Sequence, residues 1–131
     1  MSYTIEVDDT LEIVRIISLG DLNTDEIFDM IDQLNGTCFR SGVKNVLADH
    51  SRASVGDIPI MGVRSIASYC ETLNDSMDGG RLSVLLSKPL DYGIGRIWLA
   101  YVHGRLTYEA QIFRKLQKGL AYLAAKKCAA H

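Results

Sequence analysis

The segment Val46-Leu47-Ala48-Asp49-His50-Ser51 decides the fold, because in it an apolar, strand-like run ends in a cluster of polar side chains. Strand-like and helix-like segments alternate along the chain on both sides of it. In open α/β sheets, ligands and partners gather outside the carboxyl ends of the strands. The segment therefore predicts where a site lies, and it leaves the chemistry of that site open.

Hydrophobic periodicity outward from this segment predicts five strands and four helices. The strands are expected at 3–7, 11–19, 44–49, 81–87 and 106–112, and the helices at 24–41, 57–73, 91–103 and 114–127. Asn23 or Thr24 should cap the first helix and Gly42 should end it, while Asp57 and Pro59 should begin the second. The order β-β-α-β-α-β-α-β-α predicts an α/β fold.

The connections predict how the strands pair. The turn Asp8-Asp9-Thr10 is too short for a parallel crossover, so the first two strands should be antiparallel. The remaining strands should be parallel and joined by right-handed helical crossovers, which gives a mostly parallel five-stranded sheet in sequential order.

The two faces of this sheet differ in polarity. One alternation set of the strands is polar and comprises Thr4, Glu6, Glu12, Ser18, Ser83, Ser87, Thr107, Glu109 and Gln111. The helices should therefore cover one face and leave the other partly wet. Val14, Ile16 and Leu85 would form an apolar centre on the wet face, and such a patch is typical of a ligand surface or a homodimer face. The expected core includes Ile31, Val46, Val84, Trp98 and Leu120.

Composition excludes several classes of function. The chain has 131 residues, 47% of them hydrophobic, and a net charge of −2, which suits one domain over 1–131 and gives no basic footprint for nucleic acid. No apolar run approaches the roughly 18 residues of a membrane span. The first residues lack the pattern of a signal peptide, so we expect a cytoplasmic protein.

The cysteines and histidines indicate neither a metal site nor a bound cofactor. Cys38, Cys70 and Cys128 are odd in number and form no CxxC motif, which argues against a disulfide framework or a zinc site. Cys38 and Cys70 lie on the apolar stripes of helices and should be core residues. His50 and Asp49 lack a third ligand at a suitable spacing.

Three stretches carry a resemblance to a known family: Asn45-Val46-Leu47-Ala48-Asp49, Arg81-Leu82-Ser83-Val84-Leu85-Leu86, and Glu109-Ala110-Gln111-Ile112-Phe113 leading into Leu120-Ala121-Tyr122-Leu123. In these stretches and in element order the chain resembles the STAS superfamily, and most of all its stand-alone SpoIIAA-like branch. The resemblance implies a right-handed (βα) superhelix. It also implies a non-enzymatic regulatory module that, like anti-sigma-factor antagonists, acts through protein–protein interaction.

The resemblance also implies a site. Asp49 and Ser51 match the family's strand-end Asp and Ser, Asp57 matches the aspartate of its aspartate–serine pair, and Ile58 stands where the phosphorylated serine would be. Phosphorylation here would therefore have to use Ser51 or Ser54. The expected partner-binding loop comprises Asp49, His50, Ser51, Arg52, Ser54, Asp57 and Ile58.

Two other interpretations stay open beside this one. Adjacent Asp49, His50 and Ser51 invite a catalytic reading, but neighbours on a strand point to opposite faces, so they should not form a triad. We expect Asp49 to accept backbone N–H bonds and His50 to be partly exposed. The CRAL-TRIO lipid-binding domain shares the superhelix, and by analogy the alternative function is a carrier of lipid or of a small apolar molecule.

Overall fold

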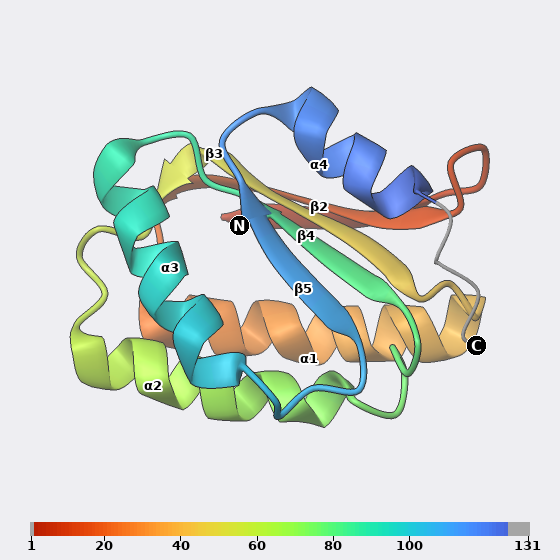
Figure 1. Ribbon diagram of the computed structural model, residues 1–131, viewed down its shortest axis with the longest axis horizontal. Coiled ribbons are helices and arrows are strands. Elements are labelled where there is room, and N and C mark those ends of the chain that lie inside the picture. The colour runs from red at the N-terminus through yellow and green to blue at the C-terminus, as the bar shows by residue number, and fades with distance from the viewer. Residues whose placement is uncertain (1, 126–131) are drawn as a thin grey trace.

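The computed structural model describes residues 2–125, in which strands and helices alternate as the sequence predicts (Figure 1). The strands are β1 (Tyr3–Asp8), β2 (Ile13–Asp21), β3 (Asn45–Ser54), β4 (Arg81–Leu85) and β5 (Glu109–Phe113). The helices are α1 (Thr24–Ser41), α2 (Ile60–Tyr69), α3 (Pro89–Val102) and α4 (Leu116–Ala124), and a 3₁₀ turn, Cys70–Leu73, follows α2. Cys128 and the expected end of the last helix lie outside the described residues.

The five strands form one sheet in the sequential order β1-β2-β3-β4-β5. The strand β1 is antiparallel to β2, and all other neighbours are parallel. This order and these directions confirm the prediction. Because β2, β3 and β4 are parallel and each is followed by a helix, α1, α2 and α3 all begin at the carboxyl edge of the sheet, at the left of Figure 1.

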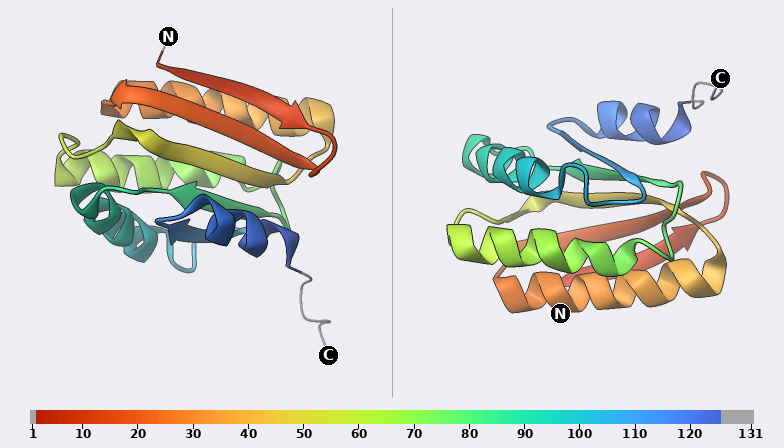
Figure 2. Two further views of the ribbon diagram at one scale, coloured as in Figure 1. Left: turned by 90° about the horizontal axis from the view of Figure 1, so that it is seen from above. Right: turned by 60° about the horizontal axis from the view of Figure 1, so that its bottom comes forward.

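The helices form two layers of unequal size (Figure 2). Three of the four, α1, α2 and α3, cover one face, and α4 lies on the other, against β3, β4 and β5. A small apolar cluster of Ile13, Leu47 and Leu123 joins α4 to that second face. Gly119 allows the close approach, since a Cβ there would lie 2.6 Å from the Ser83 Oγ. The second face is therefore less wet than the polar strand residues suggest.

The apolar centre predicted for that second face was wrong. Val14 is fully buried and Ile16 is 2% exposed, and both pack in the main core under α1, α2 and α3. Leu85 does lie on the second face, on the same side of β4 as Ser83, but it is buried as well. The assignment failed because β2 is apolar on both faces, so its alternation does not say which set faces the helices. No homodimer through these three side chains is proposed, since none of them reaches the surface.

Three of the five predicted core residues are buried, and both cysteines predicted in the core are buried as well. Ile31, Val46 and Trp98 are buried as predicted, whereas Val84 and Leu120 are half-buried at the margins of the two clusters. Cys38 and Cys70 are free and buried, and burial raises the pKa of each thiol to about 11. They are core residues, as the apolar stripes predict.

The ends of the first two helices differ in how well local sequence predicts them. Asn23 caps α1 in a capping box with Glu26, and Gly42 ends the helix with φ +72°, as predicted. For α2 the expected Asp57 cap was wrong, because the helix begins at Ile60 after Pro59 and has no side-chain cap. No helix within residues 2–125 is long and apolar enough to cross a membrane.

Candidate functional site

The polar residues after Ala48 lie on a strand and not in a loop. The strand β3 continues to Ser54, so Asp49, His50, Ser51, Arg52 and Ser54 belong to its carboxyl half. The expected loop start at Asp49 was wrong, because β2 also continues beyond a bulge after Ile17 and pairs its last residues with 52–54. Only Asp57 and Ile58 of the predicted set lie in the connection to α2.

Strand alternation separates the three polar neighbours. The Ser51 backbone N–H and hydroxyl both donate to the Asp49 Oδ1, at 3.0 and 2.6 Å, which confirms that Asp49 accepts a backbone N–H bond. His50 points to the opposite face, into the main core. These residues are therefore not assembled as a triad. The expected partial exposure of His50 was wrong, since its side chain is buried.

His50 is held by a residue that sequence reasoning placed on the wet face. Its Nδ1 shares a 2.6 Å hydrogen bond with the hydroxyl of Ser18, which is fully buried. Burial lowers the pKa of His50 to about 4, although the carboxylates of Asp49 and Asp91 act in the opposite direction. The imidazole is therefore neutral near pH 7, and the pair forms a buried polar link between β2 and β3.

A second polar link joins the end of β3 to the start of α3. The Ser54 hydroxyl donates to the Oδ1 of buried Asp91 at 3.3 Å and accepts from the Gly56 N–H at the same distance. The Lys88 ammonium donates to the Ala53 carbonyl oxygen. Sequence reasoning missed Asp91, because an acidic residue in the first turn of a helix is ordinary and its burial depends on tertiary packing.

Ile58, at the position where the resemblance places an acceptor serine, is a core residue. Its side chain is 7% exposed and its N–H donates to the Val55 carbonyl oxygen at 3.1 Å. The buried side chain of Ile58 therefore anchors the connection between β3 and α2 to the main core.

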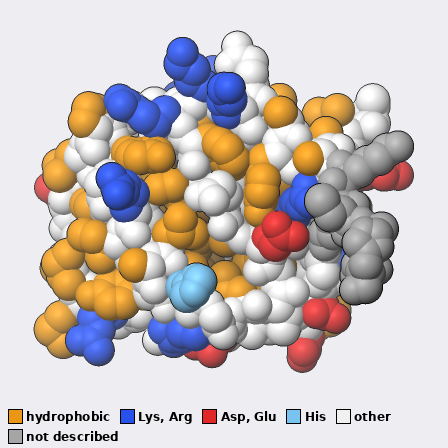
Figure 3. All heavy atoms as spheres, in the orientation of Figure 1, with side chains coloured by type: hydrophobic (Ala, Val, Ile, Leu, Met, Phe, Trp, Pro, Cys, Tyr) orange, Lys and Arg blue, Asp and Glu red, His pale blue; other side chains and the backbone are white. Residues whose placement is uncertain are grey.

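Exposed hydrophobic side chains gather at the carboxyl edge, around this connection. Leu19, Ile60, Met61 and Leu90 are 52%, 50%, 78% and 66% exposed, and together we name them the carboxyl-edge patch. Leu90 packs over Gly56, where a Cβ would lie 2.8 Å from the Leu90 Cδ2. Figure 3 shows hydrophobic side chains at the left of the molecule, over the start of α2. Single exposed apolar residues are ordinary, but a group around one connection is not.

Charged side chains flank the patch unevenly. Basic residues lie at the ends of three strands: Arg52 near the end of β3, Lys88 after β4, and Arg114 and Lys115 after β5. Figure 3 shows Lys and Arg side chains over the starts of α3 and α4. Acidic residues lie on the β2, α1 and α2 side, namely Asp21, Asp25 and Asp57. A molecule that docks here meets an apolar centre with a basic half and an acidic half.

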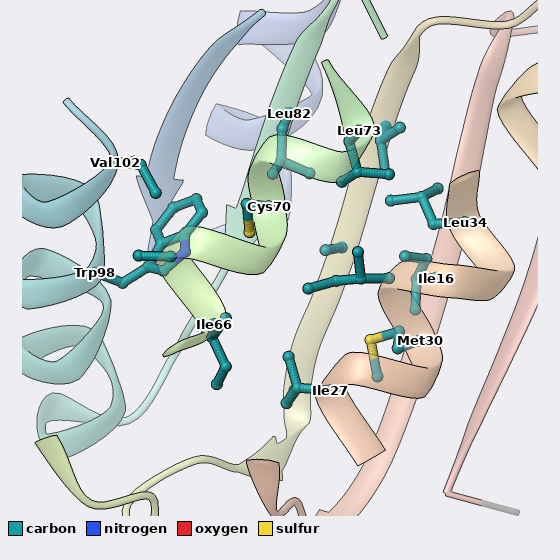
Figure 4. Close-up of a cluster of buried hydrophobic side chains, with 14 of the residues drawn as sticks. Ile16, Ile27, Met30, Leu34, Ile66, Cys70, Leu73, Leu82, Trp98 and Val102 are labelled. Carbon is teal, nitrogen blue, oxygen red and sulfur yellow. The ribbon is translucent and has the colours of Figure 1, made fainter. Parts of the chain in front are cut away.

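The main core contains a cavity of about 110 Å³ between the sheet and the helices α1, α2 and α3. In Figure 4, Trp98 and Ile66 lie on one side of this region and Ile16 and Met30 on the other. Within residues 2–125 no three His, Cys, Asp or Glu side chains are grouped as metal ligands would be.

Comparison with known proteins identifies the fold. No protein-family model and no curated protein matches the sequence. Solved structures do match: the anti-sigma factor antagonist SpoIIAA in its unphosphorylated form has a TM-score of 0.55 at 16% identity, over 88% of this chain and 91% of that one. The Bacillus cell fate determinant SpoIIAA in its phosphorylated form gives 0.51 at 13%, over 92% and 97%.

A third structure comes from the DUF3478 family of Shewanella loihica and is described as having a SpoIIAA-like fold. Its TM-score is 0.56 at 15% identity, over 93% of this chain and 92% of that one. At such low identities the likeness concerns the fold, and it confirms the SpoIIAA-like architecture that the sequence pattern predicts.

Proposed function

We propose that this chain, which has the SpoIIAA-like fold, is a non-enzymatic regulatory module that binds a protein partner at its carboxyl edge. The carboxyl-edge patch carries the proposal, because it presents four largely exposed apolar side chains around a connection that the core holds in place. The fold likeness to an antagonist of an anti-sigma factor supports a regulatory role. The free thiols of Cys38 and Cys70 suit a reducing cytoplasm.

The partner's contact surface should match this edge in chemistry. It should offer an apolar side chain to Met61 and Leu90, with acidic residues toward Arg52 and Lys88. Apolar anchors supply most of the affinity at such interfaces, and the charges at the rim set orientation and the association rate.

We also propose that the chain has no catalytic activity, because a substrate could not reach its buried serine–histidine pair. The Ser18–His50 pair is the one arrangement in residues 2–125 in which a serine hydroxyl hydrogen-bonds a histidine, and both side chains are buried. A nucleophile must reach its substrate as well as its base. The hydroxyl of Ser51 is more accessible, but it donates to Asp49 on the face away from His50.

Ser51 and Ser54 are the proposed phosphorylation sites, and the geometry favours Ser51. A phosphate on Ser54 would bring about −1.5 to −2 charges against the buried carboxylate of Asp91. A phosphate on Ser51 would also meet a carboxylate, that of Asp49, but Asp49 is only half-buried, so solvent would screen the repulsion. We therefore expect Ser51→Asp to alter partner binding without loss of stability, and Ser54→Asp to lower the unfolding midpoint.

The test is partner capture by tagged protein in lysate from the source cells, with bound proteins identified by mass spectrometry. Met61→Glu and Arg52→Glu should lose a partner that the wild type retains. Phe39→Glu is the matched control, since Phe39 is 61% exposed and lies at the end of α1, on the opposite edge of the sheet. If Met61→Glu and Phe39→Glu capture the same proteins as the wild type, the carboxyl edge is not the docking surface.

A further inference from the structure

The cavity in the main core is a feature that protein docking at the surface does not use. The sheet and the helices both line the cavity. Ile16, Ala48 and Leu82 come from the strands, and Met30, Ile66 and Trp98 come from the helices. These elements, β2, α1, β3, α2, β4 and α3, together span residues 13–102. The cavity of about 110 Å³ is therefore a property of the whole core, and not a local gap beside one side chain.

The chemistry of the wall selects a neutral molecule. No lining side chain carries a charge near pH 7: most are hydrocarbon, the others include Met30, Cys70 and Trp98, and the imidazole of His50 has its Nδ1 engaged by the Ser18 hydroxyl. A charged molecule placed here would lose its hydration and gain no ionic partner. An apolar molecule would regain the dispersion contacts that the empty space forfeits.

We propose that this cavity is a binding site for a small, neutral, apolar molecule of about six heavy atoms, a size at which apolar protein cavities accept benzene. The site is separate from the carboxyl-edge patch, whose side chains are exposed. Val55 and Ile58 line the cavity and belong to the connection between β3 and α2.

The test is titration of methyl-labelled protein with benzene, followed by nuclear magnetic resonance. The methyl resonances of Ile16, Ile66 and Leu82 should shift saturably in the wild type. Ala48→Leu adds three carbon atoms to the wall and should weaken the benzene affinity about tenfold or more, because it fills the space. Ala100→Leu adds the same atoms on the exposed side of α3 and should bind benzene as the wild type does.

Each outcome decides for or against the site. The absence of saturable shifts in the wild type would overturn the proposal, as would equal benzene affinity for Ala48→Leu and the wild type, since the probe would then bind elsewhere. If Ala48→Leu does not fold, Val63→Ile narrows the same cavity by one methylene group and takes its place. Benzoate should cause no shifts at the lining methyl groups, and shifts equal to those with benzene would contradict a neutral-ligand site.

Discussion

His50 lies among apolar side chains with its Nδ1 on the Ser18 hydroxyl, and burial keeps its pKa near 4 in the folded protein. Unfolding restores a pKa of about 6.5. The unfolded chain therefore binds a proton more readily than the folded one between pH 6.5 and pH 4. The contribution to stability is fully present above pH 6.5 and is lost as the pH falls through this range.

The prediction is that the free energy of unfolding falls by about 2 kcal/mol between pH 7 and pH 5 because of this one residue. His50→Gln should remove that part of the pH dependence, as measured by urea unfolding at both pH values. His103→Gln, at an exposed position just after α3, should leave it unchanged. Identical pH dependence in the wild type and in His50→Gln would show that His50 is not buried as a neutral group.

Trp98 is the largest side chain that lines the core cavity, and it is 8% exposed. Its truncation to Ala would enlarge a space that the core does not fill. We expect Trp98→Ala to cost about 3–5 kcal/mol. Circular dichroism during denaturant unfolding measures the cost without relying on the tryptophan signal, and a midpoint equal to that of the wild type would place Trp98 outside the core.

At the scale of elements, two glycines should respond in opposite ways to the same change. A Cβ at Gly80, just before β4, would lie 2.1 Å from the Lys44 carbonyl oxygen, so Gly80→Ala must push two backbone segments apart. We expect a loss of about 1–3 kcal/mol. Gly93, inside α3, has open space around it, and Gly93→Ala should gain about 0.5–1 kcal/mol from helix propensity.

Thermal unfolding of the two variants checks this pair. A lower midpoint for Gly80→Ala and a higher one for Gly93→Ala are expected. Equal midpoints would mean that β3 and β4 do not approach as closely as the register between Asn45 and Arg81 requires.

Element identity and order could be predicted from the sequence because periodicity and caps are local signals. Asn23 and Gly42 mark the ends of α1 where the structure has them. The extension of β3 to Ser54 could not be predicted, since its polar residues are strand only through pairing with the end of β2 beyond the bulge. The position of α4 on the second face could not be predicted either. It depends on contacts with apolar residues such as Leu47, and that residue lies on a strand that is apolar on both faces.

For the whole molecule, the parallel direction of β2, β3 and β4 brings the starts of the three helices that follow them to one edge. The sequence predicts that edge as the site because β3 ends there in polar residues. It does not predict the carboxyl-edge patch, because whether Ile60, Met61 and Leu90 face solvent depends on how the first turns of α2 and α3 are rotated against the sheet. The core cavity is likewise a result of packing, which periodicity does not measure.

The most direct test of docking at the carboxyl edge is site-specific photo-crosslinking in the source cells. A photoreactive amino acid replaces Met61 in one variant and Phe39, on the opposite edge, in another. The account predicts a discrete adduct of one partner protein at position 61 and none at position 39. The same adducts at both positions, or no adduct at position 61, would contradict it.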